Sequence, residues 1–335
     1  MKYFSLIYAA LALLILTACD RESDNPWYEK SSLDPESWAP ANLQIENVSI
    51  TEKKLTWSYD DHNIEGFKIE RKKGDGQWQE SYATLSKEAR SWNDTDIIPD
   101  QLLYYIYRLY AYAGTFNSAN IMAIYMIWEK CGDEVAFIYN KKPVFYGTVE
   151  GQNGTCWMDR NLGALRVATQ SNDREAYGDL FQWGRGDDGH QLRNSNKTHI
   201  RSSSDNPGHS RFITQTSSPY DWLNPQNDNL WQGDGGINDV CPAGWRLPTE
   251  TEFNNERLSW DGNTFYAAFA SPLKLVPAGG RFTDGFIYGI GSYGQYWTSS
   301  VSGSDARHLD IRNHPASIRN ISRVYGMSVR CIRDD

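Results

Sequence analysis

The stretch CPAGWRLPTETEF, Cys241–Phe253, carries the densest structural information in the chain. Its Pro, Gly and Trp residues fix backbone turns and fill a core, and no catalytic constellation is visible among them. Thr249 or Thr251 is expected to cap a helix that follows directly, because acidic residues occupy the first turn. Two later stretches have the same character, YGQYWTSS (Tyr293–Ser300) and GMSVRCIRD (Gly326–Asp334). Together they predict a rigid module at the end of the chain.

The N-terminus has the pattern of a secretory signal. Lys2 precedes an apolar run, Tyr3–Leu16, which has the length of a signal-peptide core and is short for a membrane span. The run ends in Leu-Thr-Ala-Cys, which resembles a bacterial lipobox. This predicts that residues 1–18 are removed and that Cys19 is lipidated, giving stable anchoring through several acyl chains. The alternative is an ordinary secretory signal with a chance cysteine.

The segment that follows, residues 19–40, is polar, acidic and contains proline, so it is expected to be a tether. Its acidic start resembles the export signals of Bacteroidetes-type lipoproteins, which implies an outer-membrane protein facing the cell exterior. A plain solvated linker is the alternative. The net charge of −9 and the lack of a basic stripe argue against a nucleic-acid partner, leaving the membrane as a partner through the lipid anchor.

Cysteine usage fits an exported protein. Of the 5 cysteines, Cys19 is assigned to the lipid, which leaves Cys131, Cys156, Cys241 and Cys331. An even set in an oxidising compartment predicts two disulfides. Three pairings are possible, and we favour Cys131 with Cys156 and Cys241 with Cys331. The second bridge would contribute roughly 4 kcal/mol in the chain-entropy account.

Residues 41–128 show strand patterns and little helical periodicity. Leu55, Trp57 and Tyr59 alternate with polar residues, as do the apolar residues of GFKIERK (66–72). About seven short strands separated by turns predict a β-sandwich.

This segment resembles a fibronectin type III domain. The likeness rests on the Trp57 strand, on GFKIERK, and on the YIYRLYA strand, Tyr105–Ala111. In that family the first tyrosine of the Y-x-Y-R pattern forms a tyrosine corner, in which its hydroxyl bonds back to the main chain. The resemblance therefore implies that Tyr105 has this role, that Trp57 lies in the core, and that the domain is a spacer or an adhesive module.

Residues 129–335 resemble the Fibrobacter succinogenes major paralogous domain, which has a C-type-lectin-like fold. The resemblance implies two helices, small sheets and long loops fastened by disulfides, so the whole chain is expected to be mainly β with an α+β C-terminal part. The residues that carry it are Trp157-Met158, Asn161-Leu162, Tyr177-Gly178, Trp183, CPAGWRLPT, Gly279-Gly280-Arg281, Tyr296–Ser300 and SVRCIRD.

Five residues of these stretches are interpreted as structural rather than ligand-binding. Trp157, Trp183, Trp245 and Trp297 have apolar neighbours in the sequence and are expected in the core. Arg246 is expected to bond main-chain carbonyls or a carboxylate.

Function is sought instead in the long polar segment 186–240, because loops on rigid scaffolds carry binding. Aromatic faces stack on sugar rings, and Asp or Asn side chains bond sugar hydroxyls. Asp and Asn oxygens can also hold Ca²⁺, but no EF-hand spacing or other metal-ligand pattern is present, so no cofactor is predicted. A solvated loop over buried tryptophans is the alternative. The candidate ligand-binding residues are Asp221, Trp222, Asp228, Trp231, Asp234, Asn238 and Asp239.

These observations predict a cell-surface lipoprotein with a non-catalytic recognition domain that binds a glycan or a surface protein. A structural subunit of a surface or fimbria-like assembly is the first alternative. An enzyme of the formylglycine-generating type, or a hydrolase, is the second, and it is disfavoured. The four cysteines are better explained as disulfides, the 6 histidines show no metal-ligand spacing, and no Gly-rich phosphate loop is present.

Overall fold

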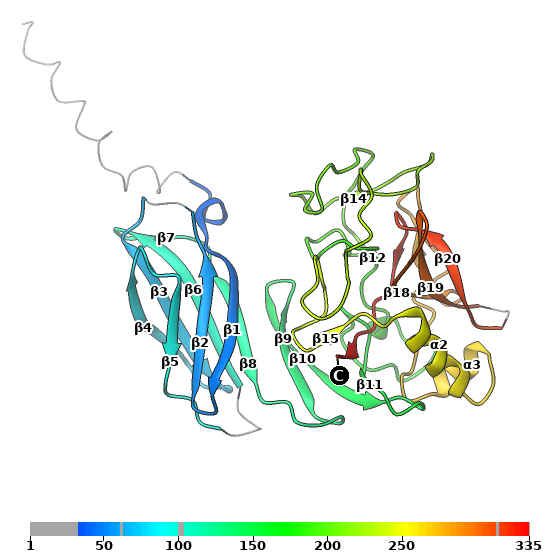
Figure 1. Cartoon of the computed structure of the whole chain (residues 1–335), viewed down its shortest axis with the longest axis horizontal. Helices are drawn as coiled ribbons and strands as arrows, with labels where there is room; N and C mark the ends of the chain where they lie inside the picture. Colours follow the sequence, from blue (N-terminus) through cyan, green and yellow to red (C-terminus); the bar gives the residue numbers. More distant parts are fainter. Residues whose placement is uncertain (1–32, 61–62, 100–103, 313–314, 335) are drawn as a thin grey trace, which may run out of the picture. The chain divides into compact units, whose positions relative to one another are not determined.

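The computed structural model describes residues 33–60, 63–99, 104–312 and 315–334 (Figure 1). The chain divides into two compact units, Met1–Ile127 and Trp128–Asp335, which are described separately. The expected signal peptide, Cys19 and the first part of the tether lie outside the described residues. Within those residues, no helix is both long and apolar enough to span a membrane.

The first unit consists of two antiparallel sheets that follow a short 3₁₀ helix, η1 (Pro35–Trp38). One sheet has the order β1-β2-β5, and the other has the order β4-β3-β6-β7 with β8 paired to β6. This is the sandwich arrangement that the fibronectin type III resemblance implies. The strands are β1 (Ala41–Ser49), β2 (Glu52–Ser58), β3 (Gly66–Lys73), β4 (Trp78–Ser86), β5 (Ser91–Asp94), β6 (Tyr104–Ala113), β7 (Phe116–Asn117) and β8 (Ile121–Met126).

Alternating side chains from both sheets form the core of this sandwich. Trp57 is 5% exposed, and its ring centroid lies 5.5 Å from that of Phe67 in an edge-to-face contact. Tyr105 is buried, and its hydroxyl accepts a hydrogen bond of 2.9 Å from the main-chain N–H of Ile98. That bond joins the start of β6 to the preceding connection, as a tyrosine corner does.

The second unit is organised around a five-stranded sheet with the order β15-β22-β11-β10-β9. The sheet brings segments from the beginning, middle and end of the unit side by side, since β22 lies between β11 and β15. Its strands are β9 (Glu134–Tyr139), β10 (Lys142–Glu150), β11 (Cys156–Met158), β15 (Trp245–Arg246) and β22 (Ile332–Arg333).

Three smaller sheets complete the unit, with the orders β12-β21-β16-β17, β18-β19-β20 and β13-β14. Many of these strands have only two residues, so long stretches of chain between them are loops. A short 3₁₀ helix, η2 (Arg174–Ala176), precedes them. The strands are β12 (Phe181–Gln182), β13 (Lys197–Thr198), β14 (Phe212–Ile213), β16 (Gly280–Arg281), β17 (Ile287–Tyr288), β18 (Gly294–Ser302), β19 (Asp305–Ile311), β20 (Ser317–Ser322) and β21 (Gly326–Met327).

The first of two helices, α2 (Glu250–Ser259), begins within the Cys241–Phe253 stretch, and α3 (Phe265–Ala270) follows it. Thr249 caps α2 with its side-chain hydroxyl. The Glu252 carboxylate accepts a hydrogen bond from the main-chain N–H of Thr249, which completes a capping box. Arg246 donates to both carboxylate oxygens of Glu252 at 2.8 and 2.9 Å, so it holds the helix start through a carboxylate.

Two disulfides fasten this unit, Cys131–Cys156 and Cys241–Cys331, the pairing favoured from the sequence. The first joins the segment before β9 to β11, and the second joins the CPAGW turn to the chain just before β22. Their sequence separations are 25 and 90 residues. Because the second bridge closes the longer loop, it restricts the unfolded chain more.

Candidate functional site

The two tryptophans expected to stack on a ligand are part of the core instead. Trp222 and Trp231 are 1% and 0% exposed, so neither ring face is open to a sugar. The Trp222 indole N–H donates to the Trp183 carbonyl at 2.7 Å, and that of Trp231 donates to the Asn238 carbonyl at 2.8 Å. Both rings thus fasten the loop segment from within, which corrects the prediction that they bind ligand.

The tryptophans predicted to be structural include two that act in the same way. Trp183 donates to the Thr298 carbonyl at 2.9 Å, and Trp297 donates to the Phe181 carbonyl at 2.7 Å. All these rings are fully buried, as are those of Trp157 and Trp245. A buried indole N–H needs an acceptor, and irregular loops expose carbonyls that need a donor. The bonds therefore satisfy both groups and fix the loops.

Two predicted acidic ligands also have internal partners. Asp221 is 3% exposed and accepts a bond from the Leu223 N–H, and burial raises the pKa of its carboxyl. Asp228 is more exposed but accepts a 2.6 Å bond from the buried Arg323, whose guanidinium lowers the pKa of that carboxyl. Arg323 also lies 4.4 Å from the centroid of the Trp183 ring. Asp228 thus offsets a buried charge.

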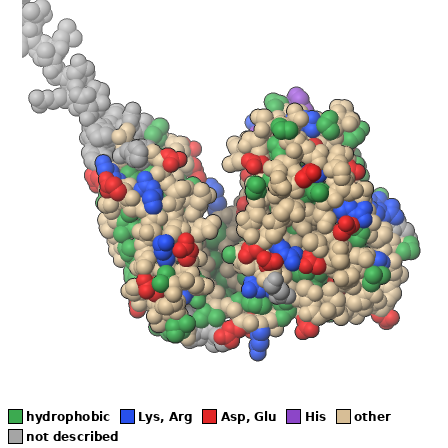
Figure 2. Space-filling view, in the orientation of Figure 1, with side chains coloured by type: hydrophobic (Ala, Val, Ile, Leu, Met, Phe, Trp, Pro, Cys, Tyr) green, Lys and Arg blue, Asp and Glu red, His purple; other side chains and the backbone are tan. Residues whose placement is uncertain are grey.

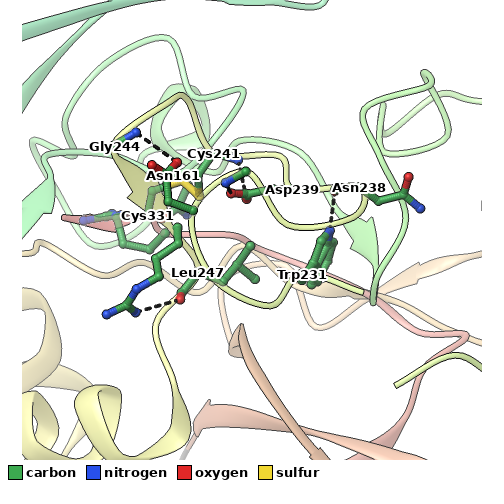
Figure 3. Close-up of a disulfide and its surroundings, with 12 residues drawn as sticks. Asn161, Trp231, Asn238, Asp239, Cys241, Gly244, Leu247 and Cys331 are labelled. Atoms are coloured by element: carbon green, nitrogen blue, oxygen red, sulfur yellow. Dashed lines mark hydrogen bonds between the residues drawn. A yellow bond between two sulfur atoms is a disulfide. The ribbon is translucent and has the colours of Figure 1, made fainter. Parts of the chain in front are cut away.

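The remaining three candidates, Asp234, Asn238 and Asp239, lie in the segment just before Cys241, and Figure 3 shows Asn238 and Asp239 with the second disulfide. Asp234 accepts from the Gly244 N–H at 2.9 Å, and Asp239 accepts from the N–H groups of Cys241 and Gly235. Asn238 donates to the main chain at two points. Burial raises the pKa of Asp239 to about 7, with the neighbouring Asp234 adding to the shift. These side chains hold the turn before the disulfide.

The predicted loop is therefore a braced frame rather than an open set of ligands. In the part of the chain that the structure describes, no group of three or more His, Cys, Asp or Glu side chains is arranged to hold a metal ion. His190, which is fully buried, bonds Asp188 and accepts from the Gln182 N–H, and burial lowers its pKa to about 4. It is a neutral structural residue at pH 7.

Exposed aromatic residues gather instead on the β16–β17 hairpin and its neighbours. The exposed fractions of Phe286, Tyr288 and Tyr220 are 57%, 46% and 42%. The Phe282 ring contacts both Tyr288 and Tyr325 edge to face, with centroids 5.0 and 5.2 Å apart. We call this group the hairpin surface, and its members are Tyr220, Phe282, Phe286, Tyr288 and Tyr325.

An Asp-Gly turn, Asp284-Gly285, places Phe282, Phe286 and Tyr288 on one hairpin. Arg281 pairs with Ile287 and Gly280 pairs with Tyr288 across the hairpin. Gly285 has a φ of +79°, which favours glycine at that position. Asp284 accepts from the Phe286 N–H at 3.0 Å and from the Tyr288 hydroxyl at 2.8 Å. The turn therefore sets the positions of both exposed rings.

Two cationic side chains join the hairpin to neighbouring segments. Lys197, on β13, donates to the Asp284 carbonyl at 3.1 Å, and its amine lies 3.7 Å from the Phe286 ring centroid. The buried Arg281 donates to the Gly285 carbonyl and to the Ser195 carbonyl, at 3.0 and 2.7 Å. Burial lowers the pKa of Arg281 to about 10, so it is still charged at pH 7.

The hairpin surface is not among the sites predicted from the sequence, although Phe286 and Tyr288 alternate directly after the Asp284-Gly285 turn. An aromatic pair at this spacing directly after a hairpin turn was the available signal. Tyr220 lies far away in the sequence, and the link between it and the hairpin is tertiary: its carbonyl accepts from the Val324 N–H.

The solved structures named below each match about a quarter of this chain. No protein-family model matches the chain, and no curated protein matches it. The solved structures that match include a computationally redesigned β-sandwich protein (20% identity, 26% of this chain and 89% of that chain, TM-score 0.23). Others are a fibronectin type III domain of human collagen XX (13%, 26% and 88%, TM-score 0.23) and an Fn3-like protein from Clostridium thermocellum (21%, 28% and 93%, TM-score 0.23). The fold of the first unit rests on its own strand order.

Proposed function

We propose that this chain is a cell-surface lipoprotein whose second unit is a C-type-lectin-like recognition domain. It binds a glycan or a protein on another surface, without chemical conversion of the ligand. The hairpin surface carries this proposal, because it places exposed aromatic rings on a frame fastened by disulfides and by side-chain bonds to the main chain. Binding sites are often formed by exposed aromatic side chains on loops that a rigid scaffold holds in position.

The first unit acts as a spacer in this proposal. It is a β-sandwich of the fibronectin type III arrangement, a fold suited to binding or structural roles outside the cell. Lipidation at Cys19 would anchor the protein in the outer membrane, with the tether and the sandwich holding the second unit toward the exterior. No cofactor is required, and nucleic acid is not a partner. Figure 2 supports the last point, since charges of both signs intermingle on the face that it shows.

A non-catalytic role is supported by how the reactive side chains are used. The cysteines of the second unit form two disulfides, so the free thiols that formylglycine-type chemistry requires are engaged. The buried His190 and Asp221 bond the main chain around them. Each of these groups therefore has a structural role. The hairpin surface consists of aromatic side chains and does not place a nucleophile beside a general base.

Two experiments test the proposal. Palmitate labelling of cells that express the full chain should mark the protein and fail for Cys19→Ser, and external protease should remove the second unit from intact cells. Binding of the full chain to polysaccharides and to cross-linked surface proteins, each with calcium and with EDTA, should give a ligand that is released unchanged. Retention only in a stoichiometric complex of surface proteins would favour the structural-subunit alternative. Turnover of a ligand would contradict the proposal.

A further inference from the structure

The charges that border the hairpin surface are already engaged within the protein. The amine of Lys197 bonds the Asp284 carbonyl and lies over the Phe286 ring. Asp284 accepts from the Tyr288 hydroxyl, which raises the pKa of Tyr288 and keeps that hydroxyl protonated at pH 7. Arg312 is bonded to Asp310 at 2.7 Å and lies over the Tyr293 ring. An acidic ligand would find none of these cations free.

The hairpin surface presents the groups that recognise a neutral polyhydroxylated ring. Phe286 and Tyr288 each expose about half of their side chain, and the C–H groups of a sugar ring pack on such aromatic faces. The Tyr288 hydroxyl and the Asp284 carboxylate lie at these rings, and Tyr325 joins them through its contact with Phe282. Their oxygens can bond sugar hydroxyls. A stable protein interface typically uses about 20 residues on each side, and the hairpin surface is much smaller.

The rings are also held in place before any ligand arrives. A Cβ at Gly285 would lie 2.9 Å from atoms of both Lys197 and Thr214, so the turn is packed closely against β13 and β14. Arg281 joins the same turn to Ser195. A preorganised site loses less conformational entropy on binding, which favours a weakly interacting ligand such as a sugar.

We propose that the hairpin surface binds an uncharged glycan by stacking sugar rings on Phe286 and Tyr288. This inference rests on the proposed recognition function and narrows it to one surface and one ligand class. Leu258 on α2 and Tyr266 on α3 are also exposed, as single apolar or aromatic side chains on a protein surface often are.

Affinity electrophoresis of the full chain tests the inference, with neutral β-glucan, mannan and xylan as probes and polygalacturonic acid and heparin as charged comparators. At least one neutral polysaccharide should retard the protein. Phe286→Ala and Tyr288→Ala should each weaken retardation at least about tenfold, and Tyr288→Phe should weaken it only a few-fold because the ring is kept. Tyr266→Ala, which removes an 80% exposed ring on α3, is the matched control and should bind as the unaltered chain does.

Salt separates the ligand classes. Binding of a neutral glycan should change little between 50 and 500 mM NaCl, because screening acts on charged contacts. Preferential retardation by an acidic polysaccharide, with a steep loss in salt, would overturn the inference. So would neutral-glycan binding that survives Phe286→Ala combined with Tyr288→Ala, although the recognition function would then stand with its site elsewhere. Failure of all neutral probes, alongside capture of a surface protein, would also overturn it while leaving that function intact.

Discussion

Both units bury tryptophan in their cores but use it differently. In the sandwich, Trp57 fills space between two regular sheets, and its indole N–H has no hydrogen-bond partner among the described residues. In the second unit, Trp183, Trp222, Trp231 and Trp297 each donate to a main-chain carbonyl of another segment. Sheets satisfy their own main-chain groups, whereas loops need side chains to do so. The main-chain hydrogen bonds of regular sheets stabilise the first unit, whereas side-chain hydrogen bonds and disulfides stabilise the loops of the second.

Removal of the Cys241–Cys331 disulfide should have the largest effect on this contrast. Replacing both cysteines with serine should cost the second unit about 4 to 5 kcal/mol, because the bridge closes a 90-residue loop. The Cys131–Cys156 bridge spans 25 residues and should cost about 3 to 4 kcal/mol. Hydrogen exchange of the full chain, followed by peptide, measures both units together. Exchange in the sandwich should be unchanged, and faster exchange there would show that the units do not unfold separately.

Each of two buried histidines should destabilise the second unit in acid, by less than the loss of the Cys241–Cys331 disulfide. Burial lowers the pKa values of His190 and His308 to about 4. Between pH 6.5 and 4 these histidines are protonated in the unfolded chain but neutral in the folded chain. The free energy of unfolding that is present above pH 6.5 is therefore lost as the pH falls. Each histidine accounts for on the order of 3 kcal/mol at the acid end of that range. The described residues of the first unit contain no histidine, so its stability should change less.

The pH dependence of the whole unit mixes opposite contributions, because the raised pKa of Asp239 makes that residue stabilise the folded state as the pH falls below 7. The variant His308→Gln removes one histidine and so isolates its contribution. The free energy of unfolding by urea, measured for the full chain at a series of pH values, gives the number of protons taken up on unfolding. That number should be smaller by up to one in the variant. An unchanged number would mean that His308 binds its proton in the folded state.

Tryptophan-to-phenylalanine pairs test the bonding difference directly. Trp222→Phe loses packing and also leaves the Trp183 carbonyl without its donor, whereas Trp57→Phe and Trp157→Phe lose packing alone, since neither indole N–H has a partner among the described residues. We expect Trp222→Phe to cost about 1 to 3 kcal/mol more than the other two. The free energy of unfolding by urea measures this. Equal losses would show that the indole bonds of the second unit contribute little.

The same contrast explains what could be predicted from sequence. Alternation in Leu55, Trp57 and Tyr59 reports directly on a sheet, so the sandwich arrangement was predictable. The disulfide pairing observed is the one favoured among three, and the cap at Thr249 is one of the two threonines that the sequence offered. The loop residues were harder, because an exposed Trp and one that bonds a distant carbonyl have the same local sequence. Trp222 and Trp231 were therefore misassigned as ligand-binding. The hairpin surface was missed because Tyr220 and Tyr325 join it only through tertiary contacts.

The smallest effect concerns one tyrosine hydroxyl in each unit. Tyr105 accepts a single bond from the Ile98 N–H, whereas Tyr296 both donates to the Val276 carbonyl and accepts from the Val276 N–H, each at 2.7 Å. Tyr105→Phe should cost about 1 kcal/mol, and Tyr296→Phe more, since two buried main-chain groups lose their partner.

Thermal unfolding of the two variants measures this difference. A given loss of free energy lowers the midpoint temperature of unfolding by roughly 4 to 8 °C per kcal/mol in a small domain and by roughly 2 to 4 °C in a larger one. The two variants must therefore be compared by their free energies of unfolding and not by their midpoint temperatures. If Tyr105→Phe proved the costlier change, the sandwich would depend on a side-chain bond as much as the loops do. The regular sheets would then not be the reason that it lacks disulfides among its described residues.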